Sequence, residues 1–116
     1  MSKITKVIAR QVYDSRGNPT IEAEVFANNM RARAICPSGA STGSHEAYEK
    51  RDTSNKRYLG KSVLKPVNLI NKIISKKLKN QNIHNQEKID YILIKLDGTK
   101  QKKKFGANSL LAVSMA

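Results

Sequence analysis

The first third of the chain carries three short runs of alternating side chains, separated by two turn signals. Residues 4–13 are rich in β-branched side chains, and residues 20–26 alternate apolar with acidic positions. Residues 30–36 alternate Arg with Ala, and residues 14–19 are dense in turn-forming types. Asn28 and Asn29 suit a tight turn because Asn tolerates positive φ. Short links between short strands predict a three-stranded antiparallel meander with one buried face.

A helical pattern begins after Lys61. Apolar residues recur at positions 63, 67, 70, 74 and 78, which is the spacing of one helix face. Ser62 is a candidate N-cap, and Pro66 falls in the first turn, where the missing N–H matters least. The pattern therefore predicts one long helix after the meander.

Two further helices follow. Residues 86–96 place four large apolar residues on one stripe, with Asn85 as a candidate cap and Gly98 as a candidate stop. A third helix is predicted to begin near Ala107, and no stop signal precedes Ala116. The whole pattern predicts an α+β fold, and the open final helix favours an N-terminal piece of a longer protein.

Composition limits the class of protein. With 116 residues, 39% of them apolar and 27% charged, the chain fits one globular domain. A single cysteine, Cys36, excludes an internal disulfide and any multi-thiolate metal site. No apolar run approaches the roughly 18 residues of a membrane span, and the N-terminus lacks a secretory apolar region. These features predict a cytoplasmic protein without a membrane span.

The net charge of +13 is concentrated in the second half, where residues 61–116 hold twelve lysines and three carboxylates. Such a field attracts nucleic acid or acidic partners at low salt. Base recognition, however, favours arginine and aromatic side chains. The second half has no arginine, and its only aromatic residues are Tyr91 and Phe105. We therefore expect no specific nucleic-acid partner, and interpret much of the excess positive charge as part of a solvated surface.

The segment after the third run is rich in hydroxyl groups and glycine. It lacks the spacing of a phosphate-binding P-loop. Residues 39–43 match G-x-S-x-G, but a catalytic triad of this type needs an acid and then a histidine downstream. His84 is the histidine that follows an acid here, and the acids before it lie close to the motif. A surface loop without a role remains one interpretation. The many donors and acceptors favour a second, a lid over a polar ligand.

Six motifs in order resemble the N-terminal domain of enolase, over essentially the whole chain. They are DSRGNPT at 14–20, PSGASTG at 37–43 with HEA at 45–47, RD at 51–52, RYLGK at 57–61, LDGT at 96–99 and FGAN at 105–108. The resemblance implies dehydration of 2-phosphoglycerate to phosphoenolpyruvate, with Mg²⁺ ions stabilising an ene-diolate. It also implies a C-terminal barrel, absent from this chain, that carries the catalytic base and acid. The isolated chain is therefore expected to be inactive.

The resemblance assigns roles to particular residues. Ser41 matches a Mg²⁺ ligand, and Arg10 and Arg16 match subunit contacts of a homo-oligomer. The substrate lid would comprise Ser38, Gly39, Ala40, Ser41, Thr42, Gly43 and His45. No catalytic residue is expected within residues 1–116. The alternative is a stand-alone, non-catalytic basic module that binds partners through its lysines.

Overall fold

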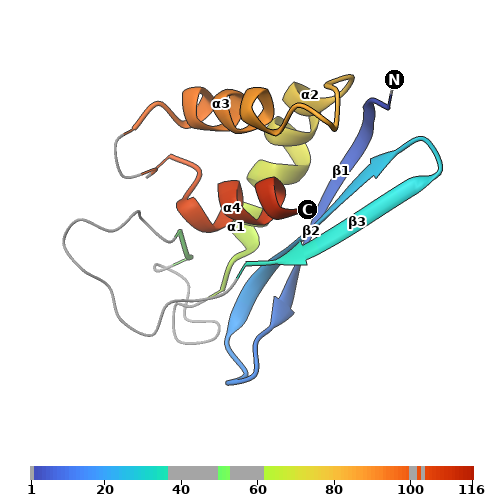
Figure 1. The fold of residues 1–116 in the computed structure, drawn as a ribbon. Coiled ribbons are helices and arrows are strands. Elements are labelled where there is room, and N and C mark those ends of the chain that lie inside the picture. The colour runs from blue at the N-terminus through green and yellow to red at the C-terminus, as the bar shows by residue number, and fades with distance from the viewer. Residues whose placement is uncertain (1, 37–49, 53–61, 100–101, 103) are drawn as a thin grey trace.

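A computed structural model describes residues 2–36, 50–52, 62–99, 102 and 104–116. It contains a sheet of three antiparallel strands in the order β1-β2-β3, followed by helices that cover one face of that sheet (Figure 1). The strands are β1 (Ile4–Tyr13), β2 (Pro19–Ala27) and β3 (Met30–Ile35). The predicted meander and α+β class are confirmed.

The strand register places small and branched residues against the helices. Val7 pairs with Val25, Ala9 pairs with Ala23, and Ile21 and Ala23 are completely buried. The other face carries Glu22 and Glu24, as the alternation predicts. These two carboxylates are nevertheless buried, which the alternation did not predict.

Both predicted turns form. A carboxylate oxygen of Asp14 accepts hydrogen bonds of 2.9 Å from the backbone N–H groups of Arg16 and Asn18. Gly17 completes this turn at φ +79°, a value that favours glycine. In the second turn Asn28 adopts φ +54° between strands that pair Ala27 with Met30. Local turn chemistry thus determines how β2 meets its two neighbours.

The first predicted helix forms as three contiguous segments: α1 (Leu64–Leu69), the π-helical η2 (Ile70–Ile74) and α2 (Ser75–Leu78). The five apolar residues that predicted it are all buried. The expected N-cap at Ser62 is wrong. Ser62 is fully buried, and its hydroxyl donates a 2.9 Å hydrogen bond to the Gln11 side chain instead. Pro66 lies in the first turn, as expected.

Strand β1 forms one edge of the sheet, and this helix covers that edge. The Asn71 amide accepts from the Ala9 N–H at 2.8 Å and donates to the Ala9 carbonyl at 3.1 Å. Farther along β1, Ile4 exchanges backbone hydrogen bonds with Asn80 and Gln81. These contacts satisfy backbone groups that an open edge strand would leave unpaired.

The remaining helices are α3 (Gln86–Asp97) and α4 (Ala107–Met115). Asn85 caps α3 by accepting from the Lys88 N–H at 3.1 Å, and Gly98 ends it at φ +72°, so both predictions are confirmed. Helix α4 packs against β2 and β3, with Ala112 and Val113 buried. Within the described part of the chain, no helix is long and apolar enough to cross a membrane.

Candidate functional site

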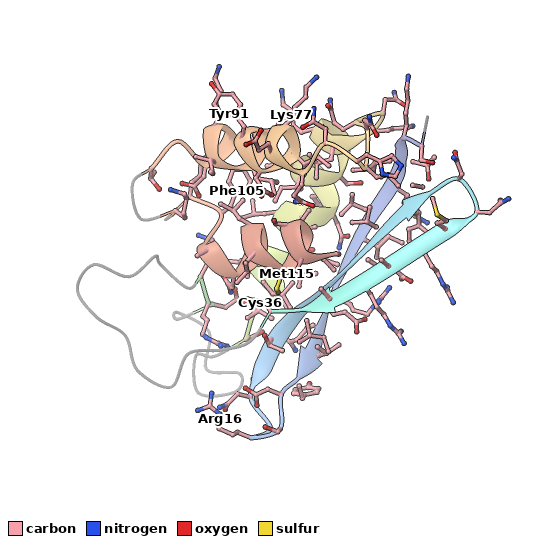
Figure 2. All side chains as sticks on the ribbon, viewed as in Figure 1. Arg16, Cys36, Lys77, Tyr91, Phe105 and Met115 are labelled. Atoms are coloured by element: carbon pink, nitrogen blue, oxygen red, sulfur yellow. The ribbon has the colours of Figure 1, made fainter. Side chains whose placement is uncertain are left out.

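The predicted lid, Ser38 to His45, lies outside the described residues, but both of its flanks are described. The first flank is the end of β3. The Cys36 N–H donates to the Ile21 carbonyl at 2.9 Å, and the Thr20 hydroxyl donates to the Cys36 carbonyl. Cys36 is buried at this end of the sheet, where it packs as a small apolar residue (Figure 2). The chain therefore leaves the sheet from a fixed position.

The second flank, residues 50–52, is held by a side chain from α4. Asn108 accepts a 2.9 Å hydrogen bond from the Lys50 N–H and donates a 2.8 Å hydrogen bond to the Lys50 carbonyl. Asn108 is itself buried. One amide thus satisfies both backbone groups of Lys50, as a neighbouring strand would. No sequence pattern indicated this pairing, because 58 residues separate the two partners.

Glycine is required directly before α4. Gly106 adopts φ +88°, and a Cβ there would lie 2.4 Å from the Lys50 Cβ and 2.9 Å from the Lys50 nitrogen. No side chain fits that space without moving the backbone of the second flank. The motif FGAN at 105–108 therefore has a physical role, which is to bring α4 against the residues that follow the lid.

Two further contacts hold the second flank. The Arg51 guanidinium donates to the Pro19 carbonyl at 2.8 Å. The buried Asp52 carboxylate accepts from the N–H groups of Leu64 and Lys65, each at 3.1 Å. Asp52 thus provides the N-terminal cap of α1 that was predicted for Ser62. A carboxylate at this helix end also interacts favourably with the helix dipole.

Asp97 organises the loop that leads to Gly106. Its carboxylate accepts from the Phe105 N–H at 2.8 Å and from both the N–H and the hydroxyl of Thr99. Burial raises the pKa of Asp97, but these hydrogen bonds outweigh it and leave the pKa below its ordinary value. The LDGT motif at 96–99 therefore ends α3 and fixes the start of α4.

The two predicted subunit-contact residues lie on different parts of the sheet. Arg10 is on the outer face of β1, where it forms ion pairs with Glu22 and, at 2.8 Å, with Glu24. The hydrogen bond from Arg10 holds the pKa of Glu24 below its ordinary value, and the same contact raises the pKa of Arg10. Arg16 projects from the turn between β1 and β2 (Figure 2), 3.8 Å from Asp14.

Another cavity in the described part of the chain lies elsewhere and is lined mainly by apolar side chains. It encloses about 660 Å³ between the sheet and the ends of α2, α3 and α4. Ile4, Met30, Ile83 and Val113 are among its lining residues. Enzymatic acid–base or metal chemistry needs convergent polar groups, so the lid region is the better candidate site.

Comparison with known proteins agrees with this anatomy. A family profile described as "Enolase, N-terminal domain" matches residues 4–116. The chain belongs to the enolase family. It is 69% identical to the enolase of Pelagibacter ubique (strain HTCC1062) over 116 residues, which is 100% of this chain and 28% of that protein. It is 54% identical to the enolase of Methanococcoides burtonii over 113 residues, or 97% of this chain and 27% of that protein.

The chain thus spans just over a quarter of the length of these enolases. Enolases generally use Mg²⁺. Among the described residues, no group of three or more His, Cys, Asp or Glu side chains is arranged to hold a metal ion. The predicted ligand Ser41 lies outside those residues. Its hydroxyl oxygen is of the hard type that Mg²⁺ prefers, but Mg²⁺ needs about six oxygen ligands, so one hydroxyl is only a partial site.

Proposed function

We propose that this chain is the N-terminal, lid-bearing domain of an enolase that dehydrates 2-phosphoglycerate to phosphoenolpyruvate in the glycolysis of the cytoplasm. The observation that carries the proposal is the 69% identity to a curated enolase over an aligned region that covers the whole chain. In this proposal residues 1–116 form one domain, and a C-terminal barrel supplies the catalytic base and acid.

The role of the chain would be to cover and complete the site. Ser41 would contribute one oxygen ligand to the second Mg²⁺, and closure of residues 38–45 over the substrate would exclude water. Bound Mg²⁺ would neutralise the charge that develops on the substrate carboxylate as the proton leaves. Gly39 and Gly43 would allow the motion, and His45 would move with the same segment.

The anchored flanks support this role. A closing segment is precise only when its ends are fixed, because the position of each lid atom depends on where the lid begins and ends. Here Cys36 is tied to the sheet and Lys50 is tied to α4. Asn108 and Asp52 are therefore proposed as positioning residues for the lid.

The first experiment compares the protein from its complete reading frame with residues 1–116 alone. Formation of phosphoenolpyruvate is followed by ultraviolet absorbance in the presence of Mg²⁺. We expect turnover by the complete protein and none by residues 1–116. Turnover by the shorter chain would contradict the assignment of the catalytic groups to a barrel. Absence of turnover by the complete protein would favour the alternative, a non-catalytic basic binding module.

The second experiment tests the lid. In the complete protein, Ser41→Ala should lower kcat and raise the Mg²⁺ concentration needed for half-maximal rate, because one metal ligand is lost. Ser44→Ala removes the same hydroxyl three residues farther along and is the matched control. An unchanged Mg²⁺ dependence in Ser41→Ala would refute the ligand assignment.

The subunit contacts are proposed separately. Arg16 is about half exposed, and Arg10 is partly exposed beside Glu22 and Glu24, so both side chains are accessible to a second copy of the protein. Arg16→Ala in the complete protein should shift the sedimentation equilibrium toward monomer. The control is Arg33→Ala, because Arg33 is an exposed arginine on β3 that forms no ion pair among the described residues. Equal behaviour of both variants would remove Arg16 from the interface.

A further inference from the structure

The helical layer presents a basic surface that no part of the proposed enolase chemistry uses. Residues 53–86 contain eight Lys or Arg residues and no Asp or Glu. In the described part of that stretch the lysines are exposed, and the same outer side continues onto α3, which packs against α2. The surface, here named the lysine face, comprises Lys72, Lys76, Lys77, Lys79, Lys88 and Lys95.

The charges of the lysine face are not neutralised within the described residues. The ion pairs there join arginines to Asp14, Glu22 and Glu24, and none involves a lysine of this face. The Asp90 carboxylate accepts hydrogen bonds from Gln86 and Ser114 on the side of α3 that faces α4. The Asp97 carboxylate is buried. Glu87, in the first turn of α3, is the exposed carboxylate on this side. The net positive field is therefore available to an external anion.

An exposed aromatic ring lies within the lysine face. Tyr91 is 61% exposed, and the Lys95 Nζ is 5.8 Å from the centre of its ring. Lys88 is one turn earlier on the same helix side. In Figure 2 the labelled Lys77 and Tyr91 both lie on the side of the helices that faces away from the sheet. A tyrosine this exposed contributes little to the core, so the fold itself does not explain it.

We propose that the lysine face binds single-stranded nucleic acid independently of sequence. Lysine ammonium groups neutralise phosphates as point charges, and an exposed ring stacks on any unpaired base. Helices α1 to α3 carry no arginine, so the bidentate arginine contact that reads a guanine edge is absent from this surface. The proposal rests on none of the enolase chemistry, and it agrees with the expectation of no sequence-specific nucleic-acid partner.

The test measures fluorescence anisotropy of a labelled 20-nucleotide oligouridine with the protein from its complete reading frame. We expect a dissociation constant on the order of 10⁻⁵ M at about 0.15 M salt, in the range of non-specific binding. If about four phosphates are contacted, the logarithm of affinity should fall against the logarithm of salt concentration with a slope of about −3. A mixed-sequence oligonucleotide should bind within a few-fold of oligouridine.

Substitutions test whether the lysine face is the surface that binds the oligonucleotide. Lys72→Gln, Lys76→Gln and Lys77→Gln together should weaken binding about tenfold or more and reduce the slope by about 2. The matched control, Lys6→Gln, Arg31→Gln and Arg33→Gln, removes the same charge from exposed positions on strands β1 and β3 and should weaken binding less than threefold. Equal losses in the two triple variants would overturn the proposal, because only total charge would then matter.

The contribution of the Tyr91 ring distinguishes binding of single-stranded nucleic acid from binding of other polyanions. Tyr91→Ala should weaken oligouridine binding several-fold, and Tyr91→Phe should retain it. Vesicles with 30% phosphatidylserine should bind more weakly than oligouridine. Preferential binding of vesicles, preferential binding of duplex DNA, or an unchanged affinity in Tyr91→Ala would each overturn the single-strand assignment. Circular dichroism confirms that the variants remain folded, as expected for exposed positions.

Discussion

Replacement of Asn108 by alanine tests whether α4 holds the residues that follow the lid. The change removes hydrogen bonds of 2.9 Å and 2.8 Å to the two backbone groups of Lys50. Each such bond contributes about 1 kcal/mol net, so the second flank should lose about 2 kcal/mol of local stability. Since 1.4 kcal/mol is a factor of ten, the open population of this flank should rise about thirtyfold.

Amide hydrogen exchange at Lys50 measures that population, because the Lys50 N–H is protected by its hydrogen bond to the Asn108 side chain. Asn108→Asp keeps the acceptor and loses the donor, so exchange should rise only about fivefold. Asn68→Ala, an exposed asparagine of α1, is the matched control and should leave exchange unchanged. Exchange at Lys50 within twofold of the wild-type rate in Asn108→Ala would refute the reasoning.

Three further changes test the supports around this site. Gly106→Ala should lower the free energy of unfolding by about 1–3 kcal/mol because of its φ of +88° alone, and by more because the added Cβ would meet the backbone of Lys50. In thermal denaturation this variant should lose more stability than Gly17→Ala, whose added Cβ would meet nothing within 4 Å. The pKa of Asp97 is below its ordinary value of 3.8, so its stabilising contribution is complete above about pH 4 and is lost as pH falls through the folded pKa. Asp97→Asn should therefore show a smaller loss of stability between about pH 4 and 2 in urea titrations. Asn71→Ala should destabilise the fold by about 1–2 kcal/mol, measured by urea denaturation, because it exposes the edge of β1 at Ala9.

Each of these three predictions has a contrary result. Equal thermal losses in Gly106→Ala and Gly17→Ala would show that the close approach to Lys50 is unimportant. A pH dependence that is identical with and without the Asp97 carboxylate would mean that its hydrogen bonds are equally strong in both protonation states. A stability unchanged in Asn71→Ala would mean that water satisfies the strand edge equally well.

Sequence alone determined the elements whose causes are local. The alternation in residues 4–36 predicted the meander, and a spacing of three and four residues predicted the first helix face. Asn85 and Gly98 marked the ends of α3 correctly because capping joins groups only three or four residues apart. The fold class followed from these periodicities, and the family from six motifs in order.

Tertiary structure alone decided which distant groups meet. Asp52, rather than the adjacent Ser62, caps α1. The Asp52 N–H donates to the Ser62 carbonyl at 2.8 Å, and the Asp52 carboxylate thus lies against the free N–H groups of the helix. Asn108 reaches Lys50 across 58 residues, and Gly106 provides the space for that approach. The burial of Glu22 and Glu24 likewise depends on the neighbouring strands. Sequence periodicity indicates which face of a helix or strand is apolar. A hydrogen bond between distant segments forms only when the two segments pack together, so periodicity does not predict it.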